Sequence, residues 1–300
     1  MAPVRPALSR RAFVLAGAAS AASAIAAPLP VRASEGPRLV SLDYGLANTA
    51  MALGVTPVGV AAAAGWSKWV VEPPLPANVA DLGMDRLINL ERLAALKPNL
   101  ILATPYVASL RSRLEDIAPV LSLTIYAPDG EPLERAYAAT RTLGDRLDRR
   151  ADADAYLAKA DAEFADWRTR IAKARPGPVV LINFMDARHA RVYGAHALFQ
   201  NALDRIGLKN GWTGPTNFWG FQTIGLEQLA QAEPGSTIVA IEPIPPDVEP
   251  TLAESPLWNR LPAVAAGRYA ELPGALAYGA VPSALRFARL ITDLTTAAHG

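Results

Sequence analysis

The sequence contains no cysteine and only three histidines. The absence of cysteine excludes disulfide bonds, a cysteine nucleophile, a lipid-anchored cysteine and every thiolate metal site. His189, His196 and His299 leave little room for a histidine-rich metal centre. Charged residues make up 19% of the chain and apolar residues 51%, which excludes wholesale disorder. A chain of 300 residues is long enough for two lobes or for one large domain.

Acidic residues are absent from residues 1–33, which contain four arginines. An alanine-rich apolar run follows Arg11, but it is too short for a spanning helix, which needs ~20 strongly apolar residues. We therefore predict a cleavable export signal that ends at Ala33. Residues 9–15 resemble a twin-arginine signal, which predicts export to the periplasm. A membrane anchor that stays attached is the alternative.

The formal net charge of +1 averages over two different parts of the chain. The whole sequence has 29 Lys and Arg against 28 Asp and Glu; without the four arginines of residues 1–33, 25 remain against 28, a net charge of −3. A mildly acidic protein lacks the basic face that nucleic-acid binding usually requires, so we expect no nucleic acid as a partner. The periplasm is oxidising, and without cysteine the fold must rely on its apolar core alone.

Short apolar runs alternate with helical patterns from residue 38 onward. The runs are continuous, which is typical of strands that are buried on both faces of a sheet. Predicted strands cover residues 38–42, 99–103, 121–125, 179–184 and 237–241. Predicted helices include residues 46–53, 89–96, 109–117, 132–147, 198–206, 226–231 and 284–297. This order predicts an α/β fold with mainly parallel sheets.

A long helix is predicted over residues 151–174, which contain neither glycine nor proline. Leu157, Phe164, Trp167 and Ile171 fall on one face of it, and charged residues fill the other. Because strands are predicted on both sides, we interpret this helix as a strut that joins two lobes; an ordinary surface helix is the alternative. The predicted organisation is a signal over 1–33, an N-terminal lobe over 34–148, a connecting helix over 149–175 and a C-terminal lobe over 176–300.

Catalytic motifs are missing from the sequence. It contains no Gly-x-Ser-x-Gly, no phosphate loop, no His-Glu-x-x-His and no Gly-x-Gly-x-x-Gly. His189 follows a predicted strand, but nothing indicates a nucleophile for it, and a hydrogen-bonded loop histidine is the expectation. Asp186 and Arg188 indicate a local turn with an ion pair.

Aromatic residues gather in two stretches that read as loops. Trp66 and Trp69 lie in one, and Trp212, Phe218, Trp219 and Phe221 lie in the other, among glycine, proline, threonine and asparagine. Aromatic residues in such surroundings often line a pocket, although burial in the core remains an alternative for each ring. The two stretches together predict a site for an organic ligand.

Several motifs resemble those of the periplasmic ferric-hydroxamate siderophore-binding proteins, the soluble receptors of ABC iron importers. They are Trp69-Val70-Val71-Glu72-Pro73-Pro74-Leu75-Pro76, Asn89-Leu90-Glu91, Asp186-Ala187-Arg188-His189, Thr216-Asn217-Phe218-Trp219-Gly220 and Tyr278-Gly279-Ala280. The resemblance implies two α/β lobes joined by one long helix, a shallow ligand cleft between them, and a monomer that binds without catalysis. It also implies that an inner-membrane ABC permease is a partner.

The resemblance implies a set of ligand-binding residues: Trp69, Tyr106, Trp219, Asn217, Phe221 and Tyr278. A ferric tris-hydroxamate is already six-coordinate, so the protein needs no metal ligands and no cofactor of its own. Aromatic faces would hold the organic shell, and a donor or two, Tyr106 among them, would reach the hydroxamate oxygens.

Two positions depart from the family pattern. Asp85 stands where the family has an arginine that binds hydroxamate oxygens; either the neighbouring Arg86 serves instead, or the contact is lost. Leu276 stands where the family has a tryptophan. The family docks on its permease through surface acids of both lobes, for which Glu115 and Glu227 are the candidates here.

The alternatives are of three kinds. The ligand can be another metal chelate: haem, a cobalamin or a catecholate siderophore. The protein can be a periplasmic enzyme that acts on an imported siderophore, although no nucleophile–base pair is visible. A structural scaffold of the periplasm is the third alternative, against which the loop tryptophans argue.

Overall fold

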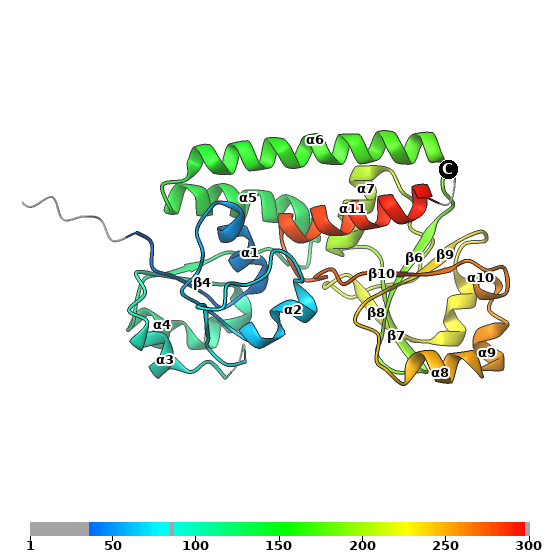
Figure 1. The fold of residues 1–300 in the computed structure, drawn as a ribbon, viewed down its shortest axis with the longest axis horizontal. Coiled ribbons are helices and arrows are strands. Elements are labelled where there is room, and N and C mark those ends of the chain that lie inside the picture. Colours follow the sequence, from blue (N-terminus) through cyan, green and yellow to red (C-terminus); the bar gives the residue numbers. More distant parts are fainter. Residues whose placement is uncertain (1–35, 85–86, 298–300) are drawn as a thin grey trace, which may run out of the picture. The chain divides into compact units, whose positions relative to one another are not determined.

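The computed structural model describes residues 36–84 and 87–297, and from Pro37 on the described residues form one compact unit. The predicted export signal, Asp85, Arg86 and His299 lie outside the described residues. Within them, the strands form two five-stranded sheets, each with its own helices (Figure 1). No helix of the described part of the chain is long and apolar enough to cross a bilayer.

The N-terminal lobe is built on a parallel sheet in the order β3-β2-β1-β4-β5. Its strands are β1 Leu39–Ser41, β2 Gly59–Val60, β3 Ala80–Asp81, β4 Leu100–Ala103 and β5 Val120–Ser122. Its helices are α1 Tyr44–Ala52, η1 Ala63–Gly65, α2 Trp66–Trp69, α3 Leu90–Ala95, η2 Pro105–Leu110, α4 Arg111–Glu115 and α5 Pro132–Arg146. β1 and β4 are buried throughout, as continuous apolar runs in a central parallel strand should be.

The C-terminal lobe is built on a mixed sheet in the order β10-β9-β6-β7-β8. Its strands are β6 Val179–Phe184, β7 His189–Tyr193, β8 Phe221–Gly225, β9 Thr237–Ile241 and β10 Tyr269–Leu272. Its short helices are α7 Leu198–Ile206, η3 Leu226–Gln231, α8 Val248–Ala253, α9 Pro256–Asn259 and α10 Pro262–Ala265. β6, β9 and β10 are parallel, whereas β7 is antiparallel to both of its neighbours. The expectation of mainly parallel strands therefore holds fully for the first sheet and partly for the second.

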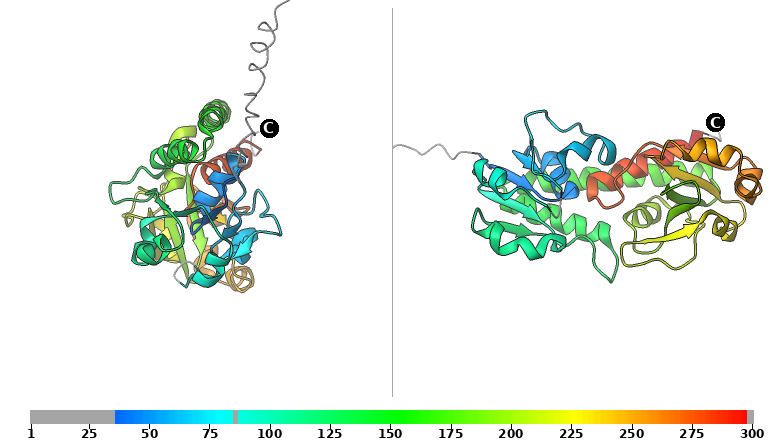
Figure 2. Two further views of the ribbon diagram at one scale, coloured as in Figure 1. Left: turned by 90° about the vertical axis from the view of Figure 1, so that its left-hand side faces the viewer. Right: turned by 90° about the horizontal axis from the view of Figure 1, so that it is seen from below.

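Two helices, α6 Arg150–Ala174 and α11 Val281–Ala297, join the lobes. α6 packs against α5 of the N-terminal lobe, α7 of the C-terminal lobe and α11, and α11 packs against α1, α5 and α7 as well. Figure 1 and Figure 2 show α6 running along both lobes and α11 running from the junction of the lobes along the C-terminal lobe. The predicted architecture of two α/β lobes with a long connecting helix is confirmed; the structure adds α11 as a second connection.

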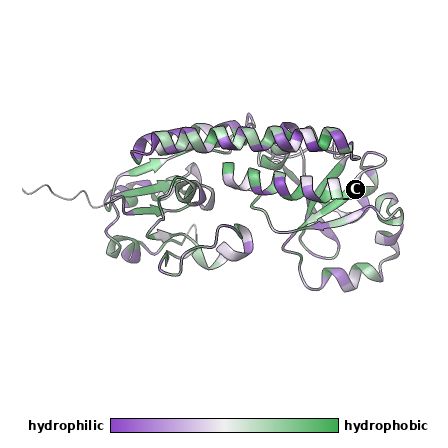
Figure 3. Ribbon diagram, turned by 45° about the horizontal axis from the view of Figure 1, so that its top comes forward, coloured by the Kyte–Doolittle hydropathy of each residue, from purple (hydrophilic) through white to green (hydrophobic). Residues whose placement is uncertain are grey.

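The sequence of α6 explains its length and its orientation. Leu157, Phe164, Trp167 and Ile171 are all buried, as their spacing predicts, and Figure 3 shows apolar and polar residues alternating around the helix. The helix ends where Arg175 adopts a left-handed conformation with φ 51°, directly before a proline. The buried side chains of α6 belong to one apolar core that continues from the first sheet to the second. α6 therefore packs on both lobes and is not an ordinary surface helix of one of them.

Some predicted element boundaries differ from the structure. The predicted helix over residues 109–117 is a 3₁₀ turn, η2, followed by the short α4, because Pro105 starts the turn early and Val107 is non-helical. The segment around Trp66 and Trp69, expected as a loop, forms the single turn α2. Phe221, also expected in a loop, begins β8.

Candidate ligand-binding site

Six aromatic rings from both lobes meet where the N-terminal lobe contacts the C-terminal lobe. They belong to Tyr106, Tyr126, Phe218, Trp219, Phe221 and Tyr278, and we call them the cleft aromatic cluster. Tyr106 and Tyr126 come from the N-terminal lobe, and Phe218, Trp219 and Phe221 come from the C-terminal lobe. Tyr278 lies on the segment that runs from β10 back to α11. Four of the six predicted residues that the resemblance singled out therefore lie together.

Trp219 is the centre of the cleft aromatic cluster. Its ring centroid lies 4.5 Å from that of Phe218, 5.8 Å from Tyr126, 5.9 Å from Tyr278 and 6.5 Å from Tyr106. The contacts with Tyr106 and Tyr278 are edge-to-face, which is the favoured arrangement of two aromatic quadrupoles. Trp219 itself is only half-buried, so part of its surface stays open to the cleft.

Asn217 holds the turn that presents Trp219. Its side-chain oxygen accepts hydrogen bonds from the backbone N–H of Trp219 at 2.9 Å and of Phe221 at 3.4 Å. Gly220 closes the turn with φ +81°, and a Cβ there would lie 2.2 Å from the backbone nitrogen of Ala197. The asparagine and the glycine of this motif thus fix the backbone that carries the ring.

Tyr126 was not predicted from the sequence, although it lies four residues beyond β5, at the carboxyl end of a parallel strand. Its hydroxyl reaches the carbonyl oxygens of Ala277 at 3.1 Å and Gly279 at 3.0 Å, which flank Tyr278. Burial, with a smaller effect from the negative charge of Asp43, raises the pKa of Tyr126 well above its ordinary value. The hydroxyl is therefore a donor at neutral pH, and it holds the Tyr278 segment against the N-terminal lobe.

Two buried polar groups at the cluster lack hydrogen-bond partners among the described residues: the hydroxyl of Tyr278 and Nε of Arg191. The guanidinium carbon of Arg191 lies 5.0 Å from the ring centroid of Phe221, which itself lies 6.2 Å from the ring of Tyr278. Burial raises the pKa of Tyr278, and the positive charge of Arg191 opposes that shift. The sequence reasoning did not single out Arg191, because it belongs to no motif.

Trp69 lies apart from the other predicted residues. It is 44% exposed, and its ring has the ammonium of Lys68 at 5.1 Å from the centroid. Trp66, on the same turn, is only 2% exposed; it meets Tyr44 edge-on at 5.6 Å and donates from Nε1 to the carbonyl of Pro73 at 2.8 Å. Trp212 is buried too, so each aromatic stretch has one tryptophan in the core and one at the cleft.

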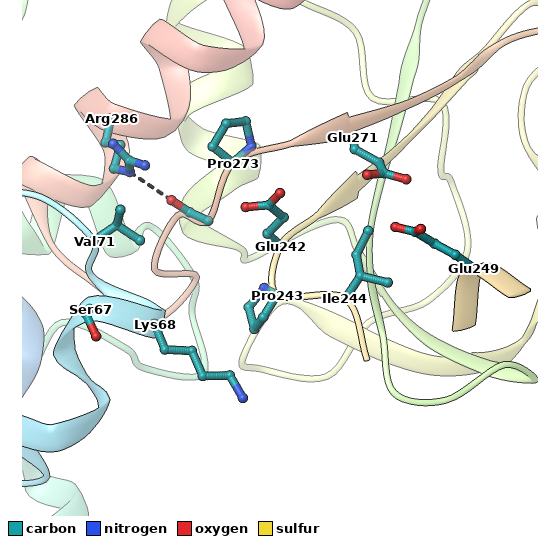
Figure 4. A pocket seen from close by; sticks show the side chains of 11 residues that line it. Ser67, Lys68, Val71, Glu242, Pro243, Ile244, Glu249, Glu271, Pro273 and Arg286 are labelled. Carbon is teal, nitrogen blue, oxygen red and sulfur yellow. Dashed lines mark hydrogen bonds between the residues drawn. The ribbon is translucent and has the colours of Figure 1, made fainter. Parts of the chain in front are cut away.

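A cavity of about 440 Å³ lies between α2 and the ends of β9 and β10. It borders the turn that carries Trp69, but no residue of the cleft aromatic cluster lines it. Figure 4 shows the carboxylates of Glu249 and Glu271 directed toward each other, with the ammonium of Lys68 directed away from them. The cavity and the cluster are thus separate parts of the interlobe surface.

An ion-pair cluster ties the N-terminal lobe to α11 beside this cavity. The carboxylate of Glu72 accepts from Arg286 and, at 2.6 Å, from Arg289. Arg286 also donates from Nε to the carbonyl of Gly274 at 2.8 Å, and its side chain is only 8% exposed. Burial works to raise the pKa of Glu72, but the two arginines together hold that pKa below its ordinary value.

The remaining residues singled out from the sequence are the two candidate docking acids and the two positions that depart from the family pattern. Glu115 ends α4 and pairs with Arg111 at 2.8 Å, and Glu227 lies in η3; both are exposed, one on each lobe. Leu276 is buried in a small core with Trp66, which explains why a leucine is accommodated there. Arg86 lies outside the described residues, so its role stays a prediction.

The histidine of the Asp186–His189 turn is hydrogen-bonded within that turn. His189 begins β7, half-exposed, and its Nδ1 lies 3.0 Å from Oδ2 of Asp186. The ion pair expected between Asp186 and Arg188 is wrong: Arg188 contributes its backbone N–H, at 2.7 Å from Oδ1 of Asp186. In the part of the chain that the structure describes, no three His, Asp or Glu side chains lie close enough to hold a metal ion.

The comparisons with known proteins agree with this architecture. A family model described as a periplasmic binding protein matches residues 39–276. The chain is 32% identical over 256 residues to the iron(3+)-hydroxamate-binding protein FhuD of Escherichia coli, which covers 85% of this chain and 86% of that protein. It is 28% identical over 183 residues to the achromobactin-binding periplasmic protein of Dickeya dadantii. That alignment covers 59% of this chain and 56% of that protein.

A solved structure allows the fold described above to be checked. The siderophore-binding protein FhuD from Vibrio cholerae, solved with Fe³⁺-Desferal, superimposes with a TM-score of 0.82 at 28% identity and covers 88% of this chain and 99% of that chain. These relatives are binding proteins, which confirms the expectation of a receptor rather than an enzyme. By its family model and its similarity to FhuD, the chain belongs to the periplasmic binding protein family.

Proposed function

We propose that this protein binds a ferric hydroxamate siderophore in the periplasm and delivers it to an ABC importer of the inner membrane. The observation that carries the proposal is the cleft aromatic cluster, which both lobes build together around Trp219. Broad aromatic faces with few polar groups suit the organic shell of a chelate. The E. coli relative is named for iron(3+)-hydroxamate binding, and the V. cholerae relative was solved with Fe³⁺-Desferal.

The chemistry of the ligand explains what the site needs. Three hydroxamates fill all six coordination positions of Fe³⁺, so the receptor contacts the organic shell and leaves the metal alone. Trp69, Trp219, Phe221 and Tyr278 are the proposed apolar contacts, and Tyr106 is a proposed polar one. Asn217 is proposed to act through the turn that it holds beneath Trp219. Arg86 remains a candidate for a contact with the hydroxamate oxygens.

Delivery would require docking on the permease. Glu115 and Glu227 are exposed on separate lobes, as a pair of docking residues would have to be. Charge reversal, Glu115→Lys or Glu227→Lys, should abolish iron uptake in cells while leaving ligand affinity unchanged. Uptake that survives in the double variant would remove both residues from the docking surface.

Export by the twin-arginine route is part of the proposal. Replacing both Arg10 and Arg11 by lysine should leave the protein in the cytoplasm, whereas the wild type should appear in the periplasm with its N-terminus at Ser34. Periplasmic accumulation of the double variant would exclude that route. We also expect a monomer, for which the mass in solution measured by light scattering is the test.

The test of the binding function is a titration of intrinsic tryptophan fluorescence. Trp219 and Trp69 are partly exposed at the cleft, so a bound iron chelate should quench them. We expect saturable quenching by ferric Desferal and no saturable response to haem, a cobalamin or a ferric catecholate. Saturation by one of those three ligands instead would reassign the substrate class. No saturation by any of them would refute the function.

A further inference from the structure

Arg191 carries a positive charge that nothing in the described structure neutralises. It lies on β7, opposite Asn183 of β6 and Thr223 of β8. It forms no ion pair with a carboxylate of the described residues, and its buried Nε has no hydrogen-bond partner there. A half-buried arginine whose Nε is buried without a partner, and which has no counter-charge beside it, is a candidate for contact with a ligand.

Tyr278 presents a second buried and unpartnered donor at the same place. No hydrogen bond of good geometry satisfies its hydroxyl among the described residues, although the side chains of Tyr193 and Arg191 lie within reach of it and oppose the effect of burial on its pKa. The hydroxyl of Tyr193 is already used, since it donates to Oδ1 of Asn183 at 2.7 Å. Because burial raises the pKa of Tyr278, its hydroxyl keeps its proton at neutral pH and can donate.

Both groups adjoin the rings that the proposed function assigns to the ligand. The guanidinium of Arg191 lies over Phe221 at 5.0 Å, and the ring of Tyr278 meets those of Phe221 and Trp219 at 6.2 and 5.9 Å. Two hydrogen-bond donors, the cationic guanidinium of Arg191 and the neutral hydroxyl of Tyr278, therefore lie beside a set of aromatic faces. Oxygen atoms that carry partial negative charge are the acceptors that this pair fits.

We propose that Arg191 and the hydroxyl of Tyr278 together bind the negatively charged oxygen atoms of the chelate. The proposal rests on the proposed function and deepens it. It assigns the cationic contact to β7 of the C-terminal lobe, independently of the segment around Arg86. A ferric tris-hydroxamate is neutral as a whole while its coordinating oxygens are electron-rich, and one arginine with one hydroxyl suits it. A ferric tris-catecholate carries three negative charges and would call for more cations.

The test compares three variants in titrations with ferric Desferal. Arg191→Leu should raise Kd roughly tenfold to a hundredfold, the range for a lost hydrogen bond to a charged group. Tyr278→Phe keeps the ring and should raise Kd roughly threefold to tenfold. Arg188→Leu is the matched control, because it removes one arginine from an exposed position three residues earlier, and its Kd should stay within about twofold of the wild type.

Thermal unfolding of the ligand-free variants separates ligand binding from a structural role. If Arg191 serves the ligand, Arg191→Leu removes an unpaired charge whose Nε is buried, and its Tm should equal or exceed that of the wild type. If Arg191 serves the fold through its contact with Phe221, that Tm should fall. The proposal would be overturned if the Tm of Arg191→Leu fell below that of the wild type and Tyr278→Phe kept the Kd of the wild type.

The two levels of the proposal fail in different ways. If the wild type binds ferric Desferal and both Arg191→Leu and Tyr278→Phe bind it equally well, this inference is wrong while the proposed function stands. If the wild type binds neither ferric Desferal nor another ferric hydroxamate, the proposed function is wrong and the inference falls with it.

Discussion

Asp43 offers a test of the fold that needs no ligand. Its Oδ1 accepts from the backbone N–H of Leu46 at 2.8 Å and caps α1, next to the segment that carries Tyr278. Burial raises the pKa of this carboxyl from 3.8 to about 6, against the lowering effect of its hydrogen bonds to backbone N–H groups. A difference of about two pKa units corresponds to about 3 kcal/mol.

The sign of the effect follows from proton linkage. Between about pH 4 and pH 6 the folded protein holds a proton on Asp43 that the unfolded chain has lost, so the free energy of unfolding decreases as the pH rises. Asp43→Asn keeps the accepting oxygen of the cap and cannot ionise. Relative to the wild type, the variant should be equally stable at pH 4 and about 2 to 3 kcal/mol more stable at pH 7.

Urea unfolding at pH 4, 5, 6 and 7, followed by circular dichroism, measures this difference. Asp186→Asn is the control, because the hydrogen bond with His189 lowers the pKa of Asp186 from 3.8 and its stabilising effect is then largely present at pH 4 already, so its difference from the wild type should change little up to pH 7. A stability difference between Asp43→Asn and the wild type that stays constant from pH 4 to pH 7, or decreases, would refute the reasoning.

Three further substitutions test separate parts of the structure. Trp219→Ala should weaken binding of ferric Desferal by about 1–3 kcal/mol, since this ring contacts four others; an unchanged Kd in a folded variant would remove Trp219 from the site. Glu72→Gln should lower the free energy of unfolding by about 1–2 kcal/mol, because it leaves the buried Arg286 without its carboxylate while Glu72 itself is half exposed. Full stability of this variant in urea would mean that the ion pair is fully screened. Phe164→Ala should cost about 3–5 kcal/mol, because its ring is 2% exposed within α6; a loss below about 1 kcal/mol would contradict a tightly packed connection.

The elements that the sequence reasoning located best are those with a strong and local pattern. β6 and β9 have the predicted bounds, because an apolar run that is buried on both faces is visible without any knowledge of its neighbours. α6 was predicted to within one residue, since its buried residues recur every three or four positions from Ala153 to Ile171 and a proline follows the helix. α7 likewise begins and ends at the predicted residues.

Other elements depend on partners that the sequence does not show. β7 contains His189 and Arg191, so it lacks a continuous apolar run, and it becomes a strand only through its pairing with β6 and β8. β2 and β3 have two residues each, which is too short for any periodicity. α11 was predicted as a helix, but its contacts with both lobes are purely tertiary.

The candidate site could be predicted in part for the same reason. Trp219 and Tyr278 belong to motifs, so a resemblance can point to them. Trp66 and Trp69 are alike in sequence, and only the packing decides that the first is buried and the second exposed. Arg191 and Tyr126 are in no motif, and tertiary contacts place them at the cluster: Arg191 lies over Phe221 of the neighbouring strand, and Tyr126 meets Trp219 of the other lobe.

The double connection through α6 and α11 has a thermodynamic consequence for a receptor of this kind. One apolar core passes from the first sheet through these helices to the second, so the lobes cannot rotate apart without shearing packed side chains. Ligand binding then immobilises no hinge. The binding free energy therefore contains no entropic cost for domain closure. The same rigidity acts on release. A cleft that does not close over its ligand leaves the lifetime of the complex to the direct contacts alone, so the release rate should follow the strength of those contacts.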